Sequence, residues 1–394
     1  MNDMSKSVYE QIDTPAILID RDIMMENLRF MQNKANQYNV NLRPHIKTHR
    51  MPALAKLQMQ AGAYGITVAK VGEAEVMAEH GLHNIFIANE IVGISKLERI
   101  RALNRKIKIR IGVDSEYQID QLEQVFHGEE KGIEVLIEFE VGENRSGVIT
   151  DEQLIQLANY IKSKKNVHLK GVFSHEGHSY KAKNAAECIK VSLESQERTV
   201  RAGNIVKKLG IDIDTISIGA TPSLMHAGII AGVTEIRPGT YIFTDVGQGS
   251  AINDFSKCAA TVLATVISKP TEERVVLDAG AKALTSQNRS EGICSTNGFG
   301  LVKNSNNIRL SGVFDEHGLI YDKDCRYCAH YFEEDAEECD GCSVGLGESC
   351  CSCHINPPCA YCTDSHFEVS PYLFEYKYYN YSFQHLYFHP LRQY

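Results

Sequence analysis

The sequence predicts an α/β protein whose largest part, residues 21–250, is a parallel (β/α)8 barrel of the TIM type. Short runs of β-branched and apolar residues alternate there with longer amphipathic stretches, which is the pattern of repeated βα units. Eight such runs occur, and eight parallel strands close a barrel. A doubly wound open sheet is the alternative, but no glycine-rich fingerprint follows the first run.

The strands expected within these runs, in chain order, are 41–44, 65–69, 84–88, 107–113, 133–141, 169–173, 215–218 and 235–237. Helices are expected over 21–38, 52–61, 73–79, 96–104, 151–164 and 185–209. In the first helix, Leu28, Met31, Ala35 and Tyr38 recur at helical spacing, so this face should pack on the core.

Residues 1–20 and 251–322 predict a small β domain built from two separate parts of the chain. The second part lacks long helical periodicity, and 259–268 and 274–277 have the composition of strands. Residues 16–19 are expected to pair with them, so the barrel would be inserted into this domain.

Composition and charge narrow the class of protein. Of 394 residues, 43% are hydrophobic and 23% charged, which is typical of a soluble globular protein. The 41 basic and 50 acidic residues give a net charge of −9, which argues against binding to nucleic acid. No apolar run is long enough to span a membrane, and residues 1–13 do not resemble a signal peptide. We expect a cytoplasmic protein without a membrane partner.

Cysteines divide the chain near residue 322. Nine of the 12 lie between Cys325 and Cys362, mostly as Cys-x2-Cys pairs. Two thiolates from one tight turn can occupy two corners of a tetrahedron, so residues 323–364 predict a zinc-ribbon-like segment. Structural zinc would be bound by Cys325, Cys328, Cys339, Cys342, Cys350, Cys353, Cys359 and Cys362. A site that uses His354, disulfides and an iron–sulfur cluster are the alternatives. The aromatic tail, residues 365–394, is compatible with a strand pair, a partner surface or a poorly folded segment.

Polar residues cluster where the first barrel strand ends. Strict alternation would place His45, Lys47 and His49 on one face. Positive charge on the histidines and on Arg43 and Arg50 would disfavour the ammonium form, so the pKa of Lys47 should be lowered. A neutral amine is what Schiff-base chemistry requires. The alternative interpretation is a solvated basic loop.

The ends of the later strands are also polar, and they carry, in chain order, Arg145, His175, His178, Gly219, Ala220, Thr221, Arg237 and Tyr241. In a parallel barrel these ends share one face. The turn at 219–223 leads into a helix, whose first N–H groups can bind a phosphate. A reactive lysine, a phosphate site and an arginine on one face indicate pyridoxal phosphate.

At this point the sequence resembles a known family, that of D-threonine aldolase and D-serine dehydratase, which are pyridoxal-phosphate enzymes of the alanine-racemase-like barrel type. The resemblance covers about residues 8–321 and rests on the segments 13–16, 43–49, 145–147, 176–178, 219–223, 234–241, 278–280 and 316–318. The Cys-rich segment and the tail do not resemble the family.

The resemblance implies roles for the residues at these positions. Lys47 would form the Schiff base and later act as a catalytic base, and Arg145 would lie beside the ring and its phenolic oxygen. His178 would be an acid–base or hydrogen-bonding group on the substrate side. His175 replaces a tyrosine of many family members, so its partner there is left open. The phosphate would be held by Gly219, Ala220, Thr221 and Tyr241.

The resemblance also implies a small-molecule substrate, a D-β-hydroxy amino acid, and a possible homodimer. Retro-aldol cleavage of the D-threonine aldolase type is favoured, and dehydration of the D-serine dehydratase type or racemisation of the alanine racemase type are alternatives. The family holds a divalent metal, Mn or Zn, through a His-x-Cys or His-x-Asp pair near the C-terminus. After Asp322 no pair in a matching context is found, and 366–368 has the spacing only. A catalytically impaired, cofactor- and zinc-binding interaction protein with an incomplete β domain is therefore a further alternative.

Overall fold

The structure, a computed structural model, describes residue 9 and residues 12–271, 273–303, 305, 308–321 and 372–375, the last four by their backbone alone. The cysteines predicted to bind zinc, from Cys325 to Cys362, lie outside the described residues, as does most of the aromatic tail. No helix in the part of the chain that is described is long and apolar enough to cross a membrane.

The central sheet has eight parallel strands in the order β2-β9-β8-β7-β6-β5-β4-β3. They are β2 (Asn41–Leu42), β3 (Ile66–Val68), β4 (Asn84–Glu90), β5 (Lys108–Val113), β6 (Ile133–Glu138), β7 (Val167–Phe173), β8 (Thr215–Ile218) and β9 (Glu235–Ile236). Beyond β2, the N–H groups of Tyr64 and Thr67 donate to the carbonyl oxygens of Leu42 and Pro44, both at 2.8 Å. These bonds join β2 and β3, the two strands at the ends of this order, so the sheet closes and the predicted barrel is confirmed.

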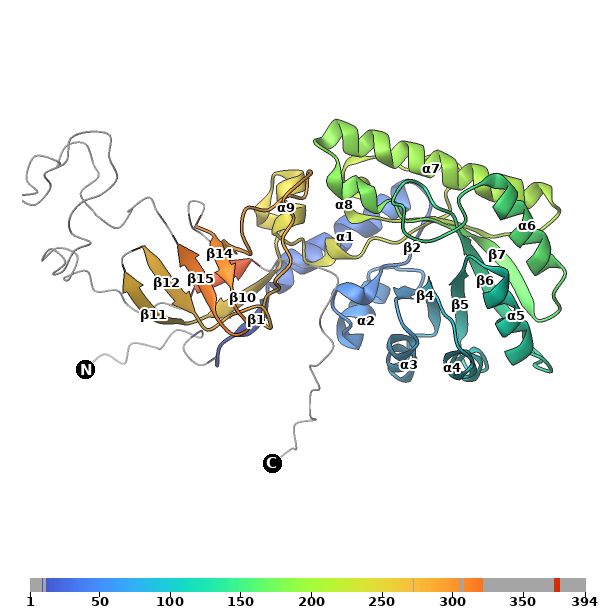
Figure 1. The fold of residues 1–394 in the computed structure, drawn as a ribbon, viewed down its shortest axis with the longest axis horizontal. Helices are drawn as coiled ribbons and strands as arrows, with labels where there is room; N and C mark the ends of the chain where they lie inside the picture. The colour runs from blue at the N-terminus through green and yellow to red at the C-terminus, as the bar shows by residue number, and fades with distance from the viewer. Residues whose placement is uncertain are drawn as a thin grey trace, which may run out of the picture.

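Most of the helices cover the outside of the sheet, whereas the last one lies beside the β domain (Figure 1). They are α1 (Arg21–Gln37), α2 (Pro52–Gln60), α3 (Val71–Glu79), α4 (Ile94–Asn104), α5 (Glu116–Val125), α6 (Asp151–Lys162), α7 (Ala185–Lys208), α8 (Thr221–His226) and α9 (Val246–Ile252). All six expected helices form. In α1, Leu28, Met31 and Ala35 are buried as predicted, whereas Tyr38 follows the helix and is exposed.

Two helices were not predicted, and each has a local cause. α5 begins with a capping box between Ser115 and Gln118, and it buries Ile119, Leu122 and Val125 at helical spacing. α9 is capped by Asp245, whose side chain accepts from the N–H of Gln248. The boundary predicted between residues 250 and 251 falls inside α9, so this helix joins the two domains rather than ending one of them.

The β domain consists of two four-stranded sheets, in the orders β1-β10-β16-β13 and β11-β12-β15-β14. Their strands are β1 (Ala16–Ile19), β10 (Ala260–Ala264), β11 (Val266–Thr271), β12 (Arg274–Leu277), β13 (Leu301–Val302), β14 (Leu310–Val313), β15 (Gly318–Tyr321) and β16 (Tyr372–Glu375). β1 pairs antiparallel with β10, as expected. The single strand predicted over 259–268 is divided between the two sheets.

The aromatic tail, for which a strand pair was one of the alternatives, contributes one strand, β16, to the β domain. This strand comes from the segment 365–394 and pairs antiparallel with both β10 and β13. It fills a position inside a sheet, where backbone groups need partners on both sides. The barrel and the β domain also share one apolar cluster, since Leu28 and Ile218 pack in the same group as Val262 and Leu277. The two domains are therefore joined by a continuous core.

Candidate active site

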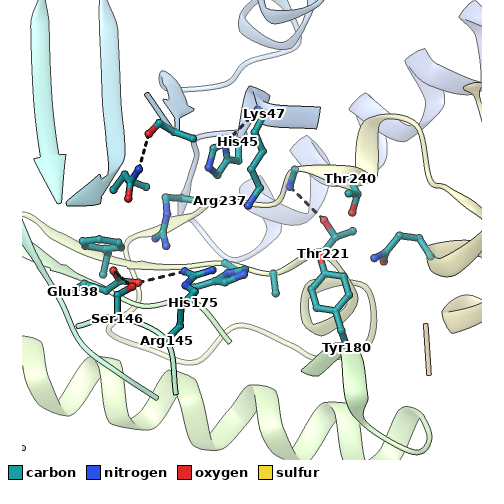
Figure 2. Close-up of a pocket in the computed structure, with 18 of the residues that line it drawn as sticks. His45, Lys47, Glu138, Arg145, Ser146, His175, Tyr180, Thr221, Arg237 and Thr240 are labelled. Carbon is teal, nitrogen blue, oxygen red and sulfur yellow. Dashed lines mark hydrogen bonds and ion pairs between the residues drawn. The ribbon is translucent and has the colours of Figure 1, made fainter. Parts of the chain in front are cut away.

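A cavity of about 590 Å³ opens at the carboxyl ends of the barrel strands. Figure 2 shows Lys47 at its centre, with Glu138 and Ser146 on one side and Thr221, Thr240 and Tyr180 on the other. Of the residues predicted for the site, the cavity is lined by Lys47, Arg145, His175, Gly219, Ala220 and Thr221. His178 and Tyr241 are not among its lining residues.

Lys47 lies on a short 3-10 helix, η2 (Ile46–Thr48), rather than on a strand. His45 precedes this helix, and its Nδ1 accepts a hydrogen bond from the Lys47 backbone N–H at 3.3 Å. The predicted sharing of one face by three residues is therefore wrong for His49, because the helical turn breaks the alternation. The His49 ring is buried instead against Gln58, with 3.2 Å between Nε2 and Oε1.

The amine of Lys47 is prepared for nucleophilic chemistry. Burial, the largest cause, and the positive charges of Arg145 and Arg237 together lower its pKa from 10.5 to about 8, against the raising effect of Glu143 and Glu73. At pH 7.5 a lysine of ordinary pKa is neutral in about one molecule in a thousand, whereas one with a pKa of about 8 is neutral in roughly a quarter. The predicted neutral amine is thus supported.

The charges that cause this differ from those predicted. Arg43 is buried and its Nε lies 2.7 Å from a carboxylate oxygen of Glu235, and Arg50 Nε lies 2.9 Å from Glu73. Both guanidinium charges are matched by a carboxylate. Neither Arg43 nor Arg50 is among the groups that lower the pKa of Lys47, whereas Arg145, from another strand end, is.

The turn after β8 has a geometry suited to binding an anion. α8 begins with Ala220 as its N-cap, a residue that has no side-chain group able to cap, so the first N–H groups of the helix are left for another acceptor. Thr221 Oγ1 accepts from the Gly239 N–H at 3.3 Å, which joins the ends of β8 and β9. The N–H of Gly219 donates to buried Glu176 instead, also at 3.3 Å. Gly219 thus shapes the turn, and the start of α8 offers the donors.

His175 links this turn to the cavity. Its Nδ1 is hydrogen-bonded to the carbonyl oxygen of Gly219, and because a carbonyl only accepts, Nδ1 carries the proton. Burial, with the charges of Lys47 and Arg145, holds the pKa of His175 well below its ordinary value. The ring is therefore neutral, and its Nε2 is a hydrogen-bond acceptor.

Arg145 is held at the other side by two carboxylates. Its guanidinium nitrogens lie 3.5 Å from oxygens of Glu138 and of Glu143, and Ser146 Oγ donates to Glu138 at 2.9 Å. Glu90 lies beside Glu138, and burial, with a hydrogen bond to Glu138 and its charge, raises the pKa of Glu90 to about 9. This side of the cavity therefore carries groups whose charge depends on pH.

The two predicted residues outside the cavity have other partners. Tyr241 is buried, and its hydroxyl accepts from Gln58 Nε2 at 3.1 Å, so its neighbours Gly239 and Thr240 line the cavity in its place. The ring of His178 is half-buried against Gly142. Its catalytic role stays a prediction that the position of the ring does not support.

Sequence reasoning placed His45 beside Lys47 but missed several other lining residues, among them Glu90, Glu138, Tyr180, Gln248 and Arg289. Glu138 ends β6, so the rule that barrel chemistry lies at strand ends could have found it. Arg237, noted at the end of the eighth strand, is buried and donates to Ser217 Oγ at 2.5 Å and to the Ser174 carbonyl at 2.6 Å. Arg289 and Gln248 follow no barrel strand, so no such signal existed for them.

The lining fits pyridoxal phosphate. It contains six lysines and arginines against three glutamates and aspartates, and this positive excess attracts a phosphorylated ligand. The uncapped start of α8 suits the phosphate, and a buried amine of lowered pKa suits the aldehyde. Within the described residues, no group of three or more His, Cys, Asp and Glu side chains is placed to hold a metal ion.

Comparison with known families agrees with this geometry. The family described as "Alanine racemase, N-terminal domain" matches residues 19–246, which are the barrel with the start of α9. The chain belongs to this family. A second family, described as "Putative serine dehydratase domain", matches residues 259–330 in the β domain, so the resemblance extends past residue 321, where it was expected to stop.

Relatives of this alanine racemase-like chain include lyases of two kinds. It is 32% identical over 315 residues to D-threonine aldolase of Arthrobacter sp., covering 79% of this chain and 80% of that protein. The crystal structure of D-threonine aldolase from Filomicrobium marinum is similar with a TM-score of 0.71 and 30% identity, over 79% of this chain and 82% of the other. D-threo-3-hydroxyaspartate dehydratase from Delftia sp. HT23 is similar with a TM-score of 0.76 and 26% identity, over 93% and 90%.

These findings make the chain an enzyme of a pyridoxal-phosphate-dependent lyase family, whose members include metal-dependent ones. The family predicted from the sequence is confirmed. Since aldolases and dehydratases both occur among the relatives, the family does not fix the reaction of this chain.

Proposed function

We propose that this enzyme cleaves D-β-hydroxy amino acids such as D-threonine between Cα and Cβ, in the manner of a D-threonine aldolase. The observation that carries the proposal is Lys47, a buried amine with a pKa of about 8 in a cavity that also holds an anion site. The 32% identity to a D-threonine aldolase favours retro-aldol cleavage among the reactions that such a site could support.

Each wall of the cavity has a separate task in this proposal. When bound, pyridoxal phosphate supplies a carbonyl that bonds to an amine and a ring that accepts the electron pair of the bond broken at Cα. Lys47 holds the proton-accepting amine at the centre. The start of α8 and Thr221 fix the phosphate, and the neutral Nε2 of His175 offers an acceptor between them.

Proton transfer is assigned in this proposal to Lys47 and to the side of the cavity that carries Glu138 and Glu143. With a pKa of about 8, Lys47 can hold or release a proton at Nζ near neutral pH. Arg145, fixed by Glu138 and Glu143, keeps a positive charge beside that amine and so favours its neutral form. Activation of the β-hydroxyl by Mn or Zn belongs to the proposal, and the described residues do not include a set of ligands for this metal.

Dehydration is the second candidate, since the similarity to the dehydratase from Delftia covers 93% of the present chain. Product analysis separates the two reactions. From D-threonine, cleavage gives glycine and acetaldehyde in equal amounts, whereas dehydration gives 2-oxobutanoate and ammonia. The assay uses D-threonine, D-serine and D-alanine, each with and without added Mn or Zn.

We expect glycine from D-threonine, with no ammonia from D-serine and no L-alanine from D-alanine. Ammonia released at the rate of D-threonine consumption would replace the aldolase with a dehydratase. Racemised alanine alone would make the enzyme a racemase. A chain that binds the cofactor yet turns over none of the three substrates with either metal would support the catalytically impaired alternative.

A further inference from the structure

A loop of the β domain, residues 289–296, docks onto the barrel beside the cavity. The Ile293 N–H donates to the Ala182 carbonyl at 2.6 Å, just after the 3-10 helix η3 (Gly177–Lys181). Gly292 has a φ of +84°, and a Cβ there would stand 2.5 Å from the Tyr180 carbonyl oxygen. Since any larger residue would collide with backbone, the contact is close and depends on this glycine.

The docked loop adds two side chains to the cavity, Arg289 and Cys294. The guanidinium carbon of Arg289 lies 4.1 Å from the ring centre of Tyr180, which itself lines the cavity. A guanidinium stacked on an aromatic face directs its N–H groups outward along its own plane. The 3-10 helix η3, which carries Tyr180, packs on α8, which begins at Thr221, so this cation belongs to the side of the anion site.

Gln248, on α9, completes the same wall. It is only 2% exposed, it lines the cavity, and its Oε1 has no hydrogen-bond partner among the described residues. Its Nε2 has a sulfur contact to Cys294 at 3.9 Å, which is a weak bond. A buried amide with an unsatisfied end is costly unless a ligand satisfies it. Because the amide can turn over, it can present either its oxygen or its N–H groups to that ligand.

We propose that Arg289 and Gln248 form an oxyanion-binding subsite at the junction of the two domains, which binds either the phosphate of the cofactor or the carboxylate of the substrate. Asp245, an acidic residue that also lines the cavity, accepts the N–H of Gln248 at 2.8 Å as the cap of α9. The subsite exists only when the loop is docked, so ligand binding and domain contact depend on each other. The existence of the subsite does not depend on the proposed function, and only the identity of the oxyanion that it binds rests on that function.

The test uses the full chain and two variants with two matched controls. Arg289→Gln removes the cation, and Gln248→Glu places a carboxylate of nearly the same shape against the oxyanion. Arg274→Gln removes an exposed cation of the β domain, and Gln287→Glu adds a charge on an exposed position near the loop. Affinities are measured by titrating the cofactor-free chain with pyridoxal phosphate and with pyridoxal, which lacks the phosphate. The loaded chain is then titrated spectroscopically with D-threonine and with D-threoninol, which lacks the carboxylate.

If the subsite binds the phosphate, both variants lose about tenfold or more in affinity for pyridoxal phosphate and keep their affinity for pyridoxal. If it binds the substrate, affinity for D-threonine falls by this factor while that for D-threoninol and for the cofactor does not. The controls should stay within about twofold of the wild type. Two folded variants that match the controls in all four titrations would overturn the subsite, and so would controls that lose as much as the variants.

Failure of the proposed function gives a different result. A wild-type chain that binds no pyridoxal phosphate would remove that function, and inorganic phosphate would then serve as the probe. Weaker phosphate binding by Arg289→Gln and Gln248→Glu, measured by calorimetry, would still support the subsite, and equal binding would overturn it. If Arg289→Gln does not fold, the titrations of Gln248→Glu alone test the subsite. This substitution should leave the fold intact, because it replaces only the amide nitrogen by an oxygen and α9 stays capped by Asp245.

Discussion

The two sides of the cavity hold their charges by different means. On the side of the anion site, the start of α8 carries backbone N–H groups and the Thr221 hydroxyl, which accepts from the Gly239 N–H, and none of these groups titrates. On the other side, Glu138 lies 3.5 Å from Arg145 and has Glu90 beside it, and Lys47 stands between the two sides. The comparison indicates that anchoring of a phosphate should be constant with pH, whereas the chemistry at Lys47 should change with it.

Loss of Lys47 should have the largest effect, because it removes the reactive amine that lies between the anion site and the side that carries Arg145. In Lys47→Ala, cleavage should fall by at least about a thousandfold, the scale seen when a covalent nucleophile is removed. Borohydride reduction of the loaded wild type should fix the cofactor on Lys47, as peptide mapping would detect. Lys70→Ala is the control, since Lys70 also lines the cavity. Labelling of Lys70 in the wild type would refute the assignment of Lys47.

Replacement of Arg145, the cation on the side of the cavity that carries Glu90 and Glu138, should slow turnover and shift the pH profile of the rate. The charge of Arg145 helps to lower the pKa of Lys47, so this pKa should rise above about 8 in Arg145→Gln. The rate, which increases as Lys47 loses its proton, should then reach half its maximum at a higher pH. At pH 7.5 we expect a loss of roughly tenfold. Arg145→Lys keeps the charge but not the planar geometry, so it should slow turnover without moving the midpoint. An equal shift in both variants would contradict this account.

A change on the anion side should weaken binding by the same factor at every pH. Thr221→Val keeps the shape but removes the hydroxyl that accepts from Gly239. Cofactor affinity should fall by about five- to tenfold, the value of one hydrogen bond. Measurements at pH 6.5 and pH 8.5 should give the same ratio of variant to wild type. A ratio that depended on pH would show that the anion side also titrates.

The smallest effect on activity is expected for Glu90→Gln, since a carboxyl with a pKa of about 9 is already protonated at neutral pH. Turnover at pH 7 should change by less than about twofold. Stability should respond more clearly. The folded chain keeps this proton between the ordinary pKa of 4.5 and about 9, so Glu90 costs stability increasingly as pH rises through that range. The Tm advantage of the variant over the wild type should therefore be larger at pH 8.5 than at pH 5.5. An advantage that shrank with rising pH would contradict the raised pKa.

Much of the site could be predicted because a parallel barrel brings its strand ends together whatever the details of packing. The eight strands were located from their apolar runs. That placed Lys47, Arg145, His175 and the 219–221 turn on one face, and all of them line the cavity. The lowered pKa of Lys47 was also expected in direction. These features depend on order along the chain and on backbone pattern, which the sequence carries directly.

Other features were decided by contacts between residues far apart in the chain. Arg43, which was expected to act on Lys47, is paired with Glu235, a residue 192 positions away in the chain. The Tyr241 hydroxyl, which was expected to bind the phosphate, accepts a hydrogen bond from Gln58 at a similar separation. Arg289 and Gln248 reach the cavity because a loop of another domain packs on η3. The amino-acid sequence by itself determined which face of the barrel carries the chemistry. Only the tertiary structure decided which charges meet there, because pairing of buried charges depends on distances that no local pattern encodes.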